Sequence, residues 1–319
     1  GIRLIVSCPE LKAEPEATVR RFMNHPATAG YFLRDEPSAD DFAELGAWAA
    51  RIRATDDAHY CYLNLFPNYA PCETLKTDSY REYVNRFDRE VPLQLLSFDH
   101  YPVVGDTCRP EWYENLEIFS DEARKAGKPF WAFALATAHE PYPIPDLAQL
   151  RLQVYSDLAY GAQGIQYFTY WTPEKNPTWD FHHAPVERSS GRRTDVYDKI
   201  KQMNAEIRAL SGVFLGCEVV SVRHTGESIP RGTVRLTELP DGVKKLETTG
   251  AGAVVSELRN GNNRFIVIVN RDFKNSMTLQ IELDETASRI LKDGSVVPAS
   301  IYHETMVVEP GDAMIYMFK

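Results

Sequence analysis

The sequence lacks several features that would place it in a particular class of protein. No apolar run approaches the roughly 20 residues that a membrane-spanning helix needs, and there is no block of Lys or Arg. The 45 acidic residues outnumber the 35 basic ones, which gives a formal net charge of −10. This balance argues against binding to the phosphate backbone of nucleic acids. We therefore expect neither a membrane span nor a nucleic-acid partner.

Motifs of several enzyme classes are also absent. The sequence has no GxSxG elbow, no phosphate-binding P-loop and no GxGxxG after an expected strand. The five cysteines form no CxxC or Cys/His ligand spacing, so buried free thiols are favoured over a zinc site. One disulfide between Cys61 or Cys72 and Cys108 remains an alternative. His182 and His183 lack a matching ligand pattern, so we expect no metal and no cofactor.

What is present is the composition of a globular protein with a sizeable core. Of 319 residues, 44% are hydrophobic and 25% are charged, and at about 150 residues per domain the length suggests two domains. The chain begins at Gly1 without an initiator Met or a signal peptide. We therefore expect a processed or excised chain, and a periplasmic or secreted location is favoured over a cytoplasmic one. The oligomeric state is not indicated.

Up to about residue 212, short apolar runs alternate with amphipathic segments. Most runs are continuously apolar, as in strands that are covered on both faces, and the segments between them have helical spacing. This alternation predicts parallel strand–helix–strand units. The expected strands are Ile2–Cys8, Gly30–Leu33, Tyr60–Phe66, Leu93–Phe98, Phe130–Ala136 and Gly164–Trp171. The expected helices are 15–24, 39–54 (with Ser38 or Asp40 as N-cap), 77–89, 111–126, 146–160 and 194–210.

The pattern changes after residue 212. Short β-rich runs are separated there by turn sequences such as Asn260-Gly261-Asn262 and Pro310-Gly311-Asp312, which predict antiparallel strands. An antiparallel β-sandwich accounts for a segment of this length and texture. We therefore expect an α/β domain over residues 1–212 and a C-terminal β-sandwich domain over residues 213–319.

Polar and aromatic side chains follow each of the later expected strands. In parallel α/β folds, functional residues gather at the carboxyl ends of the strands, so these side chains should meet at one edge. They are Arg34, Asp35 and Glu36, then Asn64, then Asp99, His100 and Tyr101, then His139 and Glu140, and finally Tyr170 and Trp171.

Glu36 is the first candidate for a catalytic role. A carboxyl at a strand end beside aromatic residues can have a raised pKa and act as a general acid on a leaving oxygen. The structural alternatives are an ion pair of Arg34 with Asp35 or Glu36, or a role of the two acids in capping the next helix. Asp99 offers a second carboxylate, with a turn before Pro102 as its alternative.

The remaining candidates are weaker individually. Glu140 lies in a Pro-rich loop and is expected to be solvated rather than catalytic. Tyr170 and Trp171 suit a stacking platform for a sugar ring, although aromatic residues at strand ends often belong to the core. A pair of carboxylates facing aromatic residues is the equipment for glycoside hydrolysis.

Several segments resemble a known family of glycosidases. Tyr31–Pro37, which reads YFLRDEP, resembles the strand-4 acid/base segment of clan A glycoside hydrolases. Ser97–Pro102, which reads SFDHYP, is similar to the S-W-D-x-Y-P segment of glycoside hydrolase family 42 β-galactosidases. The last two strands of that family look like Pro129–Trp131, Leu150–Arg151 and Gly161–Trp171. The likeness covers roughly residues 1–210.

The resemblance implies a TIM (β/α)8-type barrel and a retaining glycosidase with a carbohydrate substrate, a β-linked oligo- or polysaccharide. It gives Glu36 the role of general acid/base and expects a nucleophilic Glu at the position of Ala134. The alternatives are that Glu140 or Asp99 is the nucleophile, or that the chain is a non-hydrolytic glycan-binding protein on a decayed glycosidase barrel. The residues expected to bind substrate are Arg34, Asp35, Asn64, His100, Tyr101, His139, Tyr170 and Trp171.

The length limits the barrel. Residues 1–212 are fewer than the roughly 250 that a TIM barrel typically takes, and six strands are recognised instead of eight. The segment resembling the strand-4 motif follows the second of these strands. We therefore expect the barrel to lack its first two βα units, so that Gly1 is not the natural start or another chain supplies them.

Overall fold

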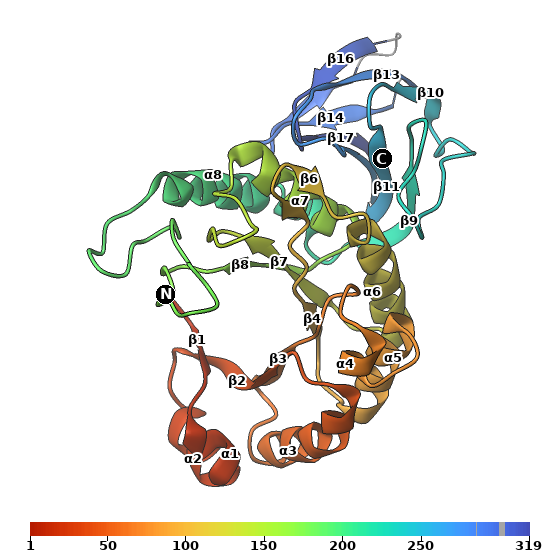
Figure 1. Ribbon diagram of the computed structural model, residues 1–319. Coiled ribbons are helices and arrows are strands. Elements are labelled where there is room, and N and C mark those ends of the chain that lie inside the picture. The colour runs from red at the N-terminus through yellow and green to blue at the C-terminus, as the bar shows by residue number, and fades with distance from the viewer. Residues whose placement is uncertain (285, 300–303) are drawn as a thin grey trace. The chain divides into compact units, whose positions relative to one another are not determined.

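The computed structural model describes residues 1–284, 286–299 and 304–319 (Figure 1). Contacts between residues divide the chain into two compact units. Unit 1 comprises Gly1–His100 and Ile118–Ala132, and unit 2 comprises Tyr101–Glu117 and Phe133–Lys319. The domain division expected at residues 212 and 213 stays a prediction. Within the described ranges, no helix is both long and apolar enough to cross a membrane.

Unit 1 is built from short strands with helices between them. Its strands are β1 (Leu4–Val6), β2 (Thr28–Asp35), β3 (Tyr60–Asn64), β4 (Leu96–Phe98) and the first half of β7 (Phe130–Leu135). Its helices are α1 (Pro9–Ala13), α2 (Pro15–Phe22), the 3-10 turn η1 (Ala39–Asp41), α3 (Phe42–Thr55), α4 (Cys72–Leu75), α5 (Tyr80–Glu90) and the second half of α6 (Trp112–Ala126). The alternation predicted from the sequence is present.

The strands of unit 1 are parallel neighbours. β2 pairs with β1 on one side and with β3 on the other, and Figure 1 shows the three side by side. Leu65 follows β3 and forms a parallel bridge to Phe98, and its N–H donates to the Ser97 carbonyl over 2.8 Å. β4 in turn pairs in parallel with β7. The ends of β2, β3 and β4 therefore come together at one edge.

Local sequence signals explain where α3 begins. The backbone N–H and the hydroxyl of Ser38 donate to the Asp41 carboxylate over 3.0 and 2.9 Å. Ser38, and not Asp40, is therefore the capping residue of the two candidates. The apolar residues at helical spacing face the core, and all are buried: Phe42, Leu45, Ala49 and Ile52.

The first part of unit 2 contains the remaining helices. They are α7 (Leu147–Ala159), α8 (Asp195–Ala209) and α9 (Ser211–Phe214), with the hairpin of β5 (Val103–Val104) and β6 (Thr107–Cys108) and the strand β8 (Gly164–Phe168). The N–H of Ala136, just after β7, donates to the Phe168 carbonyl at the end of β8 over 2.8 Å. Asp146 caps α7 by accepting the Gln149 N–H over 2.7 Å.

The second part of unit 2 is antiparallel, as predicted for the region after residue 212. Its strands are β9 (Glu218–His224), β10 (Val243–Thr248), β11 (Ala253–Asn260), β12 (Asn263–Asn270), β13 (Met277–Leu283), β14 (Ser288–Ile290), β15 (Val296–Pro298), β16 (Glu304–Val308) and β17 (Ala313–Phe318). They form a six-stranded sheet of order β15-β14-β17-β12-β11-β9 and a three-stranded sheet of order β10-β13-β16. Side chains of both sheets, including Ile268 and Leu279, share one hydrophobic core.

The six-stranded sheet contacts α7 through a buried hydrogen bond. The Ser256 hydroxyl on β11 donates to the carbonyl oxygen of Ala159, the last residue of α7, over 2.6 Å. The last carbonyl groups of a helix have no partner within the helix, so Ser256 satisfies a group that burial would otherwise leave without a donor. Nearby, the Tyr160 hydroxyl lies 2.8 Å from Nε2 of the buried His224.

Candidate active site

Glu36 follows β2 in a backbone conformation that is rare for its residue type. Its φ is 43°, a region that residues other than glycine seldom occupy. The N–H of Glu36 donates to the Asn64 carbonyl over 2.8 Å, which continues the pairing of β2 with β3. The main chain is therefore held in this conformation by the neighbouring strand, and such residues cluster at functional sites.

Three carboxyl groups of unit 1 gather near Glu36. The Glu36 and Asp99 side chains are hydrogen-bonded to each other, and the charge of Asp35 also acts on Glu36. Burial and then the negative charges of Asp99 and Asp35 raise the pKa of Glu36 to about 8. Glu36 therefore holds a proton at neutral pH and donates it to the Asp99 carboxylate.

Asn64, the last residue of β3, connects the two aspartates. Its Nδ2 donates to Asp99 Oδ1 over 2.5 Å, and its side chain also forms a hydrogen bond with Asp35. Burial raises the pKa of Asp35, and this bond to Asn64 opposes the rise. On its other side, Asn64 Oδ1 accepts from Ser97 Oγ over 3.0 Å, and Ser97 Oγ lies 3.1 Å from the Tyr62 hydroxyl. All three inner residues are buried.

Tyr83 of α5 holds the chain just after Glu36. Its buried hydroxyl donates to the Pro37 carbonyl over 2.6 Å, and burial raises its pKa. The sequence interpretation missed Tyr83, Tyr62 and Ser97 as members of this site. Ser97 stands in the SFDHYP motif and was within reach, whereas the tyrosines look like ordinary core residues of a helix and a strand.

The structural alternatives for Glu36 are not realised. Arg34 pairs with Asp41, Nη1 to Oδ1 over 2.9 Å, instead of with Asp35 or Glu36. The next helix is capped by Ser38 and Asp41, so neither preceding acid serves that purpose. His100, also in unit 1, is buried and its ring meets the ring of Tyr69 edge-on, with centroids 5.0 Å apart.

The predicted residues Tyr101, His139 and Glu140 lie in unit 2. Tyr101 and His139 are buried, and both rings contact the ring of Tyr142. Burial lowers the pKa of His139, so its imidazole is neutral at pH 7. Glu140 is exposed, as expected, and its N–H donates to Asp180 Oδ1 over 2.9 Å. His139 and Glu140 line one cavity of about 450 Å³.

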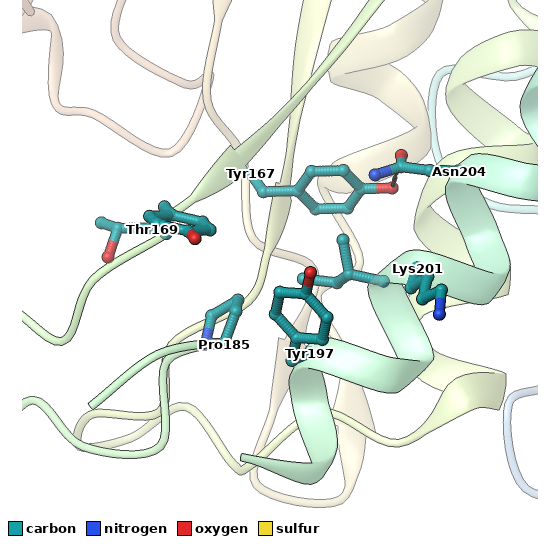
Figure 2. Close-up of a pocket in the computed structure, with 8 residues that line it drawn as sticks. Tyr167, Thr169, Pro185, Tyr197, Lys201 and Asn204 are labelled. Atoms are coloured by element: carbon teal, nitrogen blue, oxygen red, sulfur yellow. Dashed lines mark hydrogen bonds between the residues drawn. The ribbon is translucent and has the colours of Figure 1, made fainter. Parts of the chain in front are cut away.

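Tyr170 lines another cavity of unit 2, of about 460 Å³, beside β8 and α8 (Figure 2). Figure 2 shows the Tyr167 hydroxyl directed at Asn204 of α8, to whose Oδ1 it donates over 3.2 Å. Trp171 is not among the described residues that line this cavity, and its ring meets that of Tyr170 edge-on with centroids 5.5 Å apart. The other lining residues are Thr169, Pro185, Tyr197, Ile200 and Lys201.

Ala134 takes the place where the family resemblance expects a nucleophile. It lies on β7 and is fully buried, so this position offers only a methyl group to the fold. Of the two replacement candidates, Asp99 contacts Glu36 directly, whereas Glu140 belongs to the other unit.

Metal-binding side chains do not cluster in the described part of the chain. No group of three or more His, Cys, Asp or Glu residues there could hold a metal ion. His182 and His183 contact each other, with their Nδ1 atoms 2.8 Å apart. The five cysteines are free thiols, so the alternative of a disulfide to Cys108 is not realised.

Comparison with known proteins yields a family match over part of the chain. Residues 59–210 match the family model of glycoside hydrolase family 42, described as β-galactosidase. A search of curated protein sequences finds no match.

Three solved structures illustrate the similarity. A β-galactosidase from the psychrophilic Marinomonas ef1 has a TM-score of 0.46 and 11% identity, with 63% of this chain and 42% of that chain covered. A GH51 α-L-arabinofuranosidase from Thermotoga petrophila RKU-1 has a TM-score of 0.45 and 12% identity, with 95% and 69% covered. An α-amylase from H. orenii has a TM-score of 0.48 and 8% identity, with 98% and 65% covered.

The match therefore spans less than half of the length of the Marinomonas β-galactosidase. The family model covers the ends of β3 and β4, which carry Asn64 and Asp99, and extends through α8. The resemblance of this chain to the glycoside hydrolase family 42 β-galactosidases, seen first in its motifs, is confirmed over residues 59–210.

Proposed function

We propose that the chain is a glycosidase that cleaves a β-linked oligo- or polysaccharide, with Glu36 as general acid/base. The observation that carries this proposal is the hydrogen bond between Glu36 and Asp99. A protonated carboxyl beside an ionised one is the equipment of glycoside hydrolysis. The family match, which includes Asp99, supports a carbohydrate substrate.

The contact between the two carboxyl groups favours a retaining mechanism. An inverting enzyme keeps its carboxyls about 6.5–9.5 Å apart to admit a water molecule, and a retaining enzyme keeps them about 5–5.5 Å apart. A pair that is already hydrogen-bonded is closer to the second arrangement. Of the two candidates, Asp99 is therefore the better nucleophile.

In the first step, Asp99 would attack the anomeric carbon while Glu36 gives its proton to the leaving oxygen, so that the aglycone departs as an alcohol. In the second step, the Glu36 carboxylate would take a proton from water as that water displaces Asp99 from the sugar. The site then returns to its starting protonation state.

The same proposal covers the finer features predicted from the sequence. It assigns the parallel strands to a TIM (β/α)8-type barrel and residues 213–319 to a β-sandwich domain. Arg34, Asp35, His100, Tyr101 and the other predicted binding residues would surround the sugar.

The proposal is tested with hydrolysis of β-galactosides and related β-glycosides that have poor leaving groups. Glu36→Gln should reduce kcat/KM by at least about 100-fold, the usual effect of removing a general acid or base. Glu44→Gln is the matched control, because Glu44 is exposed and pairs with Lys12 over 3.0 Å. Near-full activity of Glu36→Gln would overturn the assignment.

Two further variants identify the nucleophile. Asp99→Asn should abolish accumulation of a glycosyl-enzyme, whereas Glu140→Gln should not, and NMR of the first-formed sugar should show retained anomeric configuration. Saturable oligosaccharide binding without turnover, surviving Glu36→Gln, would instead support a glycan-binding protein, the alternative that Ala134 motivates.

A further inference from the structure

Asp35, Glu36 and Asp99 share one small region, and the distribution of protons among them determines which group can act as an acid. Carboxyl groups in contact cannot all ionise easily, because their charges repel each other. The groups that act on Glu36 in the described structure are Asp99 and Asp35, and no cation is among them. A neutral donor must therefore decide which carboxyl keeps the proton.

Asn64 is the neutral donor in this cluster. Its amide has two N–H groups and one oxygen. Nδ2 donates to Asp99 Oδ1 over 2.5 Å, and Asp35 also accepts from the Asn64 side chain. Both N–H groups are thus directed to aspartates. A hydrogen bond to the ionised form of an acid favours that form, so both aspartates are favoured as carboxylates.

The orientation of the Asn64 amide is fixed from behind. Ser97 Oγ donates to Asn64 Oδ1 over 3.0 Å, and Tyr62 lies 3.1 Å from Ser97 Oγ. A flipped amide would turn its oxygen toward the aspartate oxygens and lose this donor. The main-chain bond from the Glu36 N–H to the Asn64 carbonyl holds the same residue in register.

Other titratable groups near Glu36 do not supply a competing charge. Tyr83 packs from α5, and burial raises the pKa of its hydroxyl, so it is neutral. Asp41, which faces Tyr83 from η1, is paired with Arg34 over 2.9 Å.

We propose that Asn64 is a positioning residue that assigns the shared proton to Glu36 by donating to Asp35 and Asp99, with Ser97 and Tyr62 fixing its orientation. The catalytic meaning of this arrangement rests on the proposed function, since it makes Glu36 the acid and Asp99 the nucleophile. The distribution of the proton itself does not depend on that function.

The test is a site-resolved titration of the intact chain by carbon-13 NMR of Glu36 Cδ and Asp99 Cγ. In the unchanged protein, the upper ionisation step should appear mainly at Glu36. In Asn64→Leu, the ratio of Asp99-protonated to Glu36-protonated protein should rise about tenfold, since hydrogen bonds to charged groups are stronger than ordinary ones. Ser97→Ala should shift the ratio in the same direction by a smaller factor.

Asn85→Leu is the matched control. Asn85 also donates its Nδ2 to a carboxylate of unit 1, to Glu122 Oε2 over 3.2 Å, but it lies outside the site. Its loss should leave the ratio unchanged. If Asn64→Leu does not fold by circular dichroism, Asn64→Ser and Ser97→Ala decide by the same measurement. An unchanged ratio in the folded variants overturns the proposal.

Kinetics separate this inference from the proposed function. If the chain hydrolyses no glycoside but the ratio shifts in the Asn64 variants, the inference stands and the proposed function fails. If the chain is active and the ratio does not shift, the inference fails and the proposed function stands.

Discussion

Glu36 is joined to Asn64 through the main chain, because its N–H donates to the Asn64 carbonyl over 2.8 Å while its own φ is 43°. The side chain of the same Asn64 binds Asp99 over 2.5 Å. The backbone of the proposed acid and the orientation of the proposed nucleophile therefore depend on one residue. Substitutions at this point should change stability as well as chemistry.

Replacing Glu36 with glycine should give a more stable protein than replacing it with alanine. Both variants lack the carboxyl group, so their difference isolates the backbone conformation. A left-handed conformation costs a residue other than glycine about 1–2 kcal/mol, and we expect about 1 kcal/mol in favour of Glu36→Gly. Urea unfolding of the two variants measures this difference. Equal free energies of unfolding would show that the positive φ carries no strain.

The stability of the protein should fall with rising pH through the titration of Glu36. Its pKa is raised from an ordinary value of 4.5 to about 8, so the protonated form is favoured by folding. Its contribution is complete below about pH 4.5 and is lost as the pH rises through about 8. Thermal unfolding from pH 4 to 9 should show the Tm of Glu36→Gln rising relative to that of the unchanged protein. A constant difference contradicts this prediction.

If Glu36 is the general acid, hydrolysis of a glycoside with a poor leaving group should decline above about pH 8. Above that value Glu36 loses the proton that the leaving oxygen needs. A pH profile of kcat/KM measures this decline, which should be about tenfold per pH unit. The residual activity of Glu36→Gln should lack this limb. A profile that stays level to pH 9.5 would assign the acid role to another group.

Ser256→Ala should destabilise the protein by about 1–3 kcal/mol, the usual penalty for leaving a buried polar group without its partner. The group concerned is the Ala159 carbonyl at the end of α7, which accepts from Ser256 Oγ over 2.6 Å. Ser276→Ala serves as control, because the Ser276 hydroxyl bonds Glu309 over 3.3 Å at an exposed position. Denaturant unfolding of both variants gives the comparison, and equal losses contradict the prediction.

The positions of strands and helices could be predicted because their signals are local. The apolar run over Leu93–Phe98 contains β4, and the turn at Gly261 joins β11 to β12. Strand ends were less certain, since β8 ends at Phe168 although apolar and aromatic residues continue to Trp171. Where backbone pairing stops depends on the neighbouring strand and not on the residue's own preference.

The site could be predicted only in part. Glu36 and Asp99 stood out because each is a carboxyl at the end of an apolar run. Their contact depends on the register of β2, β3 and β4, which no single segment encodes. For the same reason, Arg34 was expected beside Asp35 or Glu36, whereas it pairs with Asp41.

The hydrogen bond between Glu36 and Asp99 also links ligand binding to proton exchange with the solvent. A neutral sugar that occupies the site can leave the single shared proton in place. A cationic ring analogue favours two ionised carboxylates, so its binding at pH 7 releases that proton to the buffer. The heat of binding for such a compound would then vary with the ionisation enthalpy of the buffer, whereas that of the neutral sugar would not.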